Sequence, residues 1–205
     1  MKLNRNFWLK LAIESLLIVF SVLLALFLNN YWASKQEAER TEVVLHSIRE
    51  ELRANKAIVE EWQKNHQAVL ENIAYYRPRT QAYDSLVHQH QFQFGLLFTE
   101  TLVPNIVRST AWETAKTTGM VQHFDLELAT ALSDVYDLQR LGPMRTIEKL
   151  TDLVNERQTH QREHVPQTLV LFQFAMQELV GQEYILLQAY TRALQQLDAR
   201  MDRKK

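Results

Sequence analysis

The sequence predicts an all-α protein in which one N-terminal transmembrane helix continues into a long heptad-patterned helix and then into a helical bundle. The apolar stretch from Leu11 to Leu28 contains a single charged residue. After it, apolar residues recur at alternating steps of three and four, the spacing of a helix face. Only four Gly and four Pro occur among 205 residues. That is fewer than the usual ~7% and ~5%, and it favours helices over turn-rich sheets.

We divide the chain into four parts. A helix from Trp8 to Trp32 rises about 36 Å, enough to cross a hydrocarbon core of about 30 Å. Aromatic residues at both ends of this helix fit the two membrane interfaces, so a lipid bilayer is an expected partner. The parts are a basic N-terminal flank (1–10), a transmembrane helix (11–32), a stalk helix (33–77) and the remaining helices of the bundle (78–205).

The apolar stretch predicts an uncleaved signal-anchor rather than a cleaved signal peptide. Cleavage requires small residues at −3 and −1, and Ala33 is preceded two positions earlier by Tyr31. Basic residues near the span set its orientation, but their number is equal on the two sides. The compact N-terminal cluster of Lys2, Arg5 and Lys10 favours a cytoplasmic N-terminus.

Glu14 is the unusual residue of the span, because a carboxylate inside a bilayer is costly unless it is paired, protonated or turned toward protein or water. Glu14 shares a helix face with Lys10, Ser21 and Ala25. Three interpretations stay open: pairing with Lys10, a helix–helix contact in a homo-oligomer, or a proton or ion path. We expect Glu14, Ser21 and Ala25 to form a transmembrane helix interface, since Ser21 and Ala25 allow close approach.

The stalk helix carries an unbroken heptad seam, which predicts a coiled coil or a bundle helix. Asn55 and His66 are polar positions in this seam, and a buried Asn often fixes register or strand number. His66 is either pH-sensitive or satisfied by a neighbouring carbonyl or carboxylate. We expect the seam residues Asn55, Val59, Trp62 and His66 to mediate self-association. The complete seam is Leu45, Ile48, Leu52, Asn55, Val59, Trp62, His66, Val69, Ile73 and Tyr76.

Further helices follow the break at Pro78. A short helix is expected over 81–91, and 92–98 is ambiguous between loop and strand. Thr110 and Glu113 read as a capping box that opens a helix ending at Gly119. Asp125 caps a helix that ends at Gly142. A helix over 144–163 and a last helix over 166–201 complete the bundle, and the last one is too short in its apolar part to be a second span.

Two histidine patterns are weak metal candidates. His160 and His164 flank a glutamate in an H-x-x-E-H arrangement, in which two histidines one helical turn apart can hold zinc. A third protein ligand is missing nearby, and Pro166 follows within two residues of His164. His88 and His90 would share a face only on a strand. We therefore expect no metal, no cofactor and no catalytic residues.

The order of these pieces resembles a family of uncharacterised single-span bacterial membrane proteins. In that family the span carries an early Glu, a Gly seven residues later and an Ala-Leu pair, and ends in Asn-Asn-Trp. Here Ser21 stands in place of the Gly, and Tyr31 separates Asn30 from Trp32. The resemblance continues through Ser109–Gly119 and Leu132–Tyr136. It implies architecture, a bacterial inner-membrane setting and Glu14 as a family feature, but no activity.

Composition narrows the function classes. The chain has 23 basic and 24 acidic residues, so it lacks the positive surplus that a nucleic-acid-binding protein uses. It has no cysteine, which excludes thiol catalysis and disulfides. We expect a non-enzymatic, membrane-anchored scaffold that self-associates and meets a protein partner that the sequence does not identify. A small-ligand sensor domain outside the cytoplasm, or a proton- or ion-conducting oligomer using Glu14, are the alternatives.

Overall fold

The computed structural model describes residues 5–202, and they belong to two compact units, Met1–Val43 and Val44–Lys205. Helix α1 (Arg5–Tyr76) contributes residues to both units. The N-terminal flank at 1–10 falls partly outside the described residues, since Lys2 lies there, whereas Lys10 lies within α1.

The first unit consists of the N-terminal part of α1. Every described side chain from Trp8 to Arg40 is exposed, including the long apolar run. Among the described residues, α1 is the one helix long and apolar enough to cross a membrane. Exposed Leu, Ile, Val and Phe side chains on all sides of a helix are costly in water, and a bilayer removes that cost.

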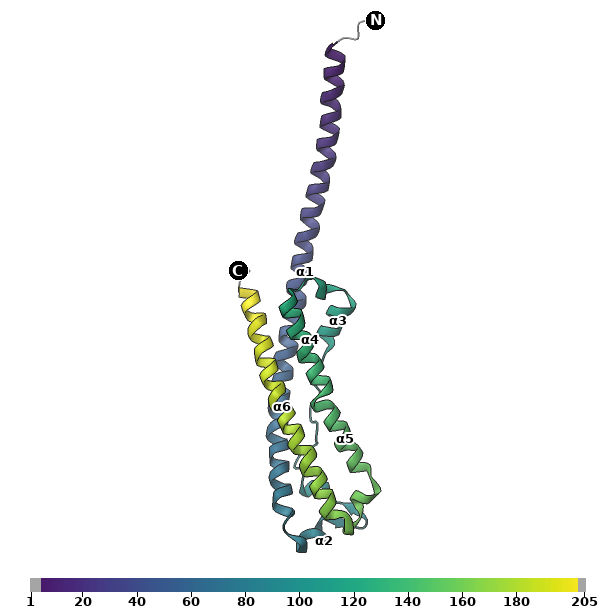
Figure 1. Cartoon of the computed structure of the whole chain (residues 1–205), viewed down its shortest axis with the longest axis vertical. Helices are drawn as coiled ribbons and strands as arrows, with labels where there is room; N and C mark the ends of the chain where they lie inside the picture. Colours follow the sequence, from purple (N-terminus) through teal and green to yellow (C-terminus); the bar gives the residue numbers. More distant parts are fainter. Residues whose placement is uncertain (1–4, 203–205) are drawn as a thin grey trace. The chain divides into compact units, whose positions relative to one another are not determined.

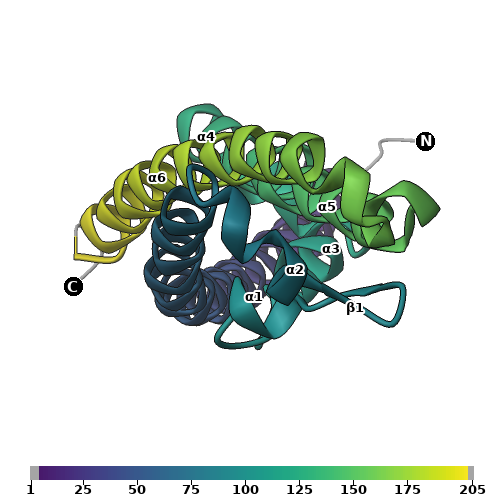
Figure 2. The ribbon, with the colours of Figure 1, turned by 90° about the horizontal axis from the view of Figure 1, so that it is seen from below.

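The second unit is a helical bundle, so the predicted fold class is confirmed. It combines α1 from Val44 onward with α4 (Leu126–Leu141), α5 (Pro143–Asn155) and α6 (Val165–Asp202). Helix α6 runs antiparallel to α1 (Figures 1 and 2). Pairs joining Arg49 to Asp198, His66 to Glu183 and Arg77 to Gln173 fix that register.

Helices α4 and α5 follow one another along α6 and are separated by a break at Gly142 (Figure 1). Gly142 fits this break because it has no Cβ. A Cβ at Gly142 would lie 2.8 Å from the main-chain oxygen of Leu138. Pro143 then opens α5 at a position where its missing N–H costs nothing. Asp125 caps α4 as predicted, accepting a hydrogen bond of 2.9 Å from the N–H of Leu128.

The helix expected over 81–91 is wrong in its second half. After η1 (Thr80–Ala82) and α2 (Tyr83–Leu86), a hairpin forms from β1 (Val87–His88) and β2 (Gln91–Phe92). Its two turn residues, Gln89 and His90, have φ of 49° and 60°. Two positive φ values in a two-residue loop match the twist of paired strands, which explains why the hairpin replaces a helix here. A short η2 (Phe94–Leu96) follows.

The capping box is also corrected. Helix α3 spans Thr110–Thr117, and its N-cap is Ser109, whose side chain makes no capping hydrogen bond. The N–H of Ala111 instead donates to the carboxylate of Glu51, 2.9 Å away, so a residue of α1 supplies the cap. The predicted end is confirmed, because Gly119 adopts a left-handed φ of 73° just before η3 (Met120–His123).

The helix predicted over 144–163 stops at Asn155. Side chains just beyond this point bind its last carbonyls: Thr159 donates to Leu153 and His160 to Val154. Asn155 itself donates to Thr151. These bonds replace the missing intrahelical partners, so the helix ends without a glycine. Two short turns, η4 (Arg157–His160) and η5 (Arg162–His164), then lead to α6.

Candidate functional site

The four predicted seam residues lie in the core of the second unit. Asn55, Val59, Trp62 and His66 are 1%, 0%, 0% and 1% exposed within a single chain. Their burial arises from contacts inside the bundle, so they are not available to a second copy. Self-association through the stalk seam stays a prediction that the contacts of the single chain do not support, whereas the heptad pattern itself correctly marks the buried face of α1.

Polar side chains of α1, from the seam and beside it, hold the main chain of an internal segment, which we call the inner segment (residues 97–111). Asn72 donates from Nδ2 to the oxygen of Leu97 at 2.9 Å. His66 Nε2 lies 2.7 Å from the oxygen of Leu102. Further along α1, the indole of Trp62 donates to Asn105 O at 3.1 Å. Each of these bonds joins a side chain of α1 to a backbone carbonyl.

Asn55 makes the most complete of these contacts. Its Nδ2 donates to the oxygen of Arg108 at 2.6 Å, and its Oδ1 accepts from the N–H of the same residue at 2.8 Å. Residue numbers fall along α1 as they rise along the inner segment, so the two run antiparallel. The side chains of α1 thus take the place of a neighbouring strand and satisfy main-chain groups of a segment that lies mostly outside regular helices and strands.

His66 also contacts Glu183 of α6. The distance from His66 Nδ1 to Glu183 Oε1 is 2.6 Å, and both side chains are buried. The second oxygen, Glu183 Oε2, has no hydrogen-bond partner in the part of the chain that the structure describes. Burial raises the pKa of the Glu183 carboxyl above its ordinary value, although the neighbouring His66 opposes that shift.

The protons of this pair can be assigned from the hydrogen bonds. The Leu102 oxygen can only accept, so His66 Nε2 carries a hydrogen. A contact of 2.6 Å between Nδ1 and Oε1 then needs one proton between them. If Glu183 is ionised, a carboxylate oxygen lies buried without a donor, whereas a protonated Glu183 leaves only a neutral carbonyl oxygen. Burial and the unpaired oxygen both favour the protonated form of Glu183, in which the acid hydroxyl donates to His66 Nδ1.

A second buried polar group joins α1, α4 and α6. Gln139 Oε1 accepts from Asn55 at 3.1 Å and from the hydroxyl of Tyr190 at 2.6 Å. Nearby, the hydroxyl of Tyr136 donates to Glu51 at 2.8 Å. Burial raises the pKa of both tyrosines far above the ordinary value, and the Glu51 charge adds to this. Both phenols are therefore neutral donors that fix helix positions.

Sequence reasoning did not identify Gln139 and Glu183, although a signal for both was present. Glu183 continues the three-and-four spacing of the apolar stripe of α6 between Leu179 and Leu186. Gln139 likewise follows Val135 by four residues on the buried face of α4. A polar residue in register with a buried stripe indicates a buried polar partner, as Asn55 and His66 do in α1.

The four candidate metal histidines do not come together. His160 accepts at Nδ1 from the N–H of Phe92 and donates at Nε2 to Val154, so both ring nitrogens are used. Gln161, in extended conformation, separates it from the turn that holds His164. His88 and His90 lie exposed on the hairpin. Among the described residues, no group of three or more His, Asp and Glu side chains could hold a metal ion.

In the first unit, Glu14, Ser21 and Ala25 are exposed on α1. The hydroxyl of Ser21 donates to Leu17 O at 2.8 Å, within its own helix. Ser21 therefore acts as a small residue on the helix surface, and its hydroxyl needs no partner from another chain. Among the described residues, no ion pair joins Glu14 to Lys10.

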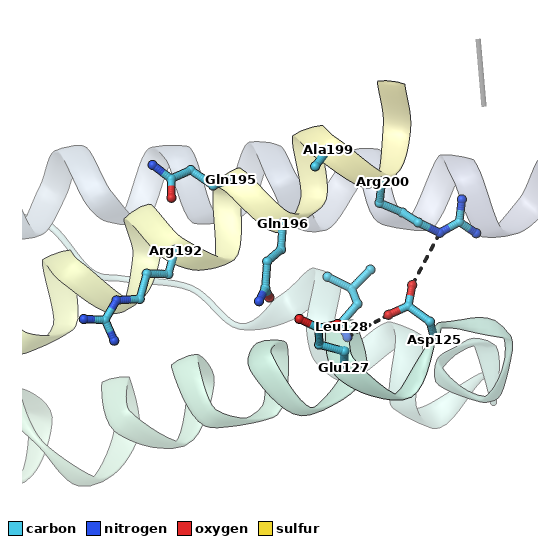
Figure 3. A pocket seen from close by; sticks show the side chains of 8 residues that line it. All are labelled: Asp125, Glu127, Leu128, Arg192, Gln195, Gln196, Ala199 and Arg200. Atoms are coloured by element: carbon cyan, nitrogen blue, oxygen red, sulfur yellow. Dashed lines mark hydrogen bonds and ion pairs between the residues drawn. The ribbon is translucent and has the colours of Figure 1, made fainter. Parts of the chain in front are cut away.

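A cavity of about 720 Å³ lies between the N-terminal end of α4 and the last turns of α6 (Figure 3). It contains two acidic and two basic side chains, Asp125, Glu127, Arg192 and Arg200, so it does not select the sign of a ligand charge. Asp125 already caps α4 and lies 3.5 Å from Arg200. The Asp125–Arg200 pair joins the two helices.

A second cavity, of about 650 Å³, has an apolar lining and is called the aromatic cavity below. Phe94 and Phe98 pack edge-on against Phe172, with ring centroids 5.8 and 6.1 Å from it. Three threonines and one carboxylate, Glu100, complete the lining. Its volume and composition are those of small-molecule sites.

Comparisons with known proteins do not assign this chain to a family. No family model matches the sequence, and neither the curated proteins nor the solved structures gave a match.

Proposed function

We propose that this protein is a membrane-anchored, non-enzymatic interaction module that self-associates through its transmembrane helix. The observation that carries the proposal is the exposed carboxylate of Glu14 within the apolar part of α1. A carboxyl group facing lipid is costly, and a second helix that accepts or donates a hydrogen bond removes much of that cost. Ser21 and Ala25 lie on the same face and allow a second helix to approach.

The setting is the inner membrane of a bacterium, with a cytoplasmic N-terminus and the bundle on the other side. Lys2, Arg5 and Lys10 before the span support this orientation. The resemblance of the span to single-span bacterial proteins supports the setting. Because the chain has no cysteine, one introduced at the exposed Gln89 reports the side directly. Labelling of Gln89→Cys in intact cells by a membrane-impermeant maleimide is expected, and labelling only after lysis would contradict the orientation.

The buried polar groups support an interaction role over a catalytic one. The side chains that a catalytic reading would select, His66 and His160, use both ring nitrogens within the fold. A general base needs a nitrogen that can reach a substrate proton. We propose that the module presents its bundle at the membrane to a protein partner.

Native mass spectrometry of the full chain in mild detergent tests the proposal. The wild type is expected to be an oligomer, and Glu14→Leu combined with Ser21→Leu is expected to dissociate it. Glu14→Gln keeps a hydrogen-bonding group and is expected to retain the oligomer. Leu23→Ala, on the opposite face of the helix, is the matched control and should leave the mass unchanged. A monomeric wild type, or a double variant with unaltered mass, contradicts self-association through this face.

A further inference from the structure

We propose that the aromatic cavity binds a small apolar molecule that carries one positive charge. The proposal does not depend on self-association. Its first support is the lining, in which the half-buried Phe94 and Phe98 supply aromatic rings and Leu102 and Val154 supply aliphatic surface, whereas Phe172 and Leu150 are fully buried behind the accessible surface. Such a lining removes an apolar ligand from water, and ring faces attract a cation.

The charged side chain in the lining determines which sign of ligand charge the cavity favours. Among the described residues that line the cavity, Glu100 is the one charged side chain. Its Oε2 accepts from Asn65 Nδ2 at 2.8 Å, which holds the carboxylate in place on α1. An anionic ligand would meet this carboxylate and the negative faces of the phenylalanine rings, so both features disfavour it. A cation gains from both.

The cavity is formed before a ligand arrives. Hydrogen bonds from Asn72 and His66 fix the main chain at Leu97 and Leu102, on either side of Phe98 and Glu100. Phe172 is fully buried, so its ring is fixed by packing. Little ordering is therefore needed on binding, and a preformed site binds more tightly than one that must order.

The matched probes are naphthylmethyl-trimethylammonium, its neutral carbon isostere and naphthalenesulfonate. Binding is measured by saturation-transfer NMR on the full chain in nanodiscs of zwitterionic lipid, with protein-free nanodiscs subtracted. The cation is expected to bind at least about tenfold more tightly than the sulfonate, and more tightly than the isostere. Equal affinity for the cation and its isostere, tighter binding of the sulfonate, or binding of none of the three overturns the proposal.

Three variants locate the site. Glu100→Gln keeps an acceptor for Asn65 and is expected to weaken binding of the cation about threefold to tenfold. Glu113→Gln, an exposed glutamate that pairs with Lys116, is the charge control and should leave the affinity unchanged. Gly95→Phe fills the cavity, since a Cβ at Gly95 meets no atom within 4 Å, and binding should be lost. An unaltered affinity in Glu100→Gln excludes this cavity as the cation site.

Discussion

Replacing Glu183 by Gln tests the protonation state of the buried pair. If Glu183 is a neutral acid, the amide of the variant donates to His66 Nδ1 in place of the acid hydroxyl, with nearly the same shape. The ordinary pKa of a glutamate is 4.5, and the pKa of Glu183 is raised in the folded state. The folded wild type therefore keeps a proton that the unfolded chain releases above pH 4.5, whereas the variant has no such proton.

The direction and the size of the pH effect on the free energy of unfolding follow from the linkage between proton binding and folding. The stability that this proton contributes is complete below pH 4.5 and is lost as the pH rises toward the raised pKa of Glu183. Relative to Glu183→Gln, the free energy of unfolding of the wild type should fall by up to about 1.4 kcal/mol per pH unit. Near pH 4.5 the two should differ little. Over the first pH unit above this value the variant gains about a factor of five in its folding equilibrium, and about a factor of ten in each further unit below the raised pKa of Glu183.

The assay is urea unfolding of the full chain in non-ionic detergent, followed by circular dichroism at several pH values. Glu178→Gln is the matched control. Glu178 lies on the same helix but is exposed, so its profile should parallel that of the wild type. A protonated Glu183 would be refuted if the difference between wild type and Glu183→Gln stayed constant with pH, or if the wild type gained stability relative to Glu183→Gln as the pH rose.

Three further predictions concern stability and use the same assay. Asn55→Ala should lower the free energy of unfolding by about 2 kcal/mol, because it unpairs the N–H of Arg108 and leaves the Arg108 carbonyl with only the 3.3 Å bond from Gln139 Nε2. A loss below about 1 kcal/mol would contradict the role of the inner-segment contacts. Gly142→Ala should lower the free energy of unfolding by about 1–3 kcal/mol, because the added Cβ clashes with the backbone. Gly181→Ala should raise it by up to about 1 kcal/mol, because Gly181 lies within a helix and its Cβ would meet open space. A Gly142→Ala variant more stable than Gly181→Ala would contradict this packing. His90→Gly should stabilise by about 0.5–1 kcal/mol by relieving a positive φ, and a loss would show that the hairpin turn differs.

The helices and their buried faces could be predicted from the sequence because each depends on local spacing. The three-and-four pattern from Leu45 to Ile73 marks a face that is buried throughout. The break at Gly142 and the cap at Asp125 likewise depend on only a few adjacent residues. These features need no knowledge of the rest of the chain.

The inner segment could not be predicted, because its path depends on residues far away in the sequence. Asn55 and its partner Arg108 are separated by 53 positions, and the segment itself shows no period. The same reason explains the misplaced cap of α3, which comes from Glu51. A periodic pattern states that a face is buried but not what buries it.

That distinction explains why the heptad seam of α1, taken from the sequence alone, predicts self-association. A heptad seam with one Asn has the same appearance whether it faces a second copy or the chain itself. In this protein the polar seam residues have a use that a second helix would not provide. A neighbouring α-helix satisfies its own main chain, whereas the inner segment offers free carbonyls and an N–H. Amide, indole and imidazole groups at these positions therefore indicate a non-helical segment against α1, which is why we propose the surface of the span for self-association.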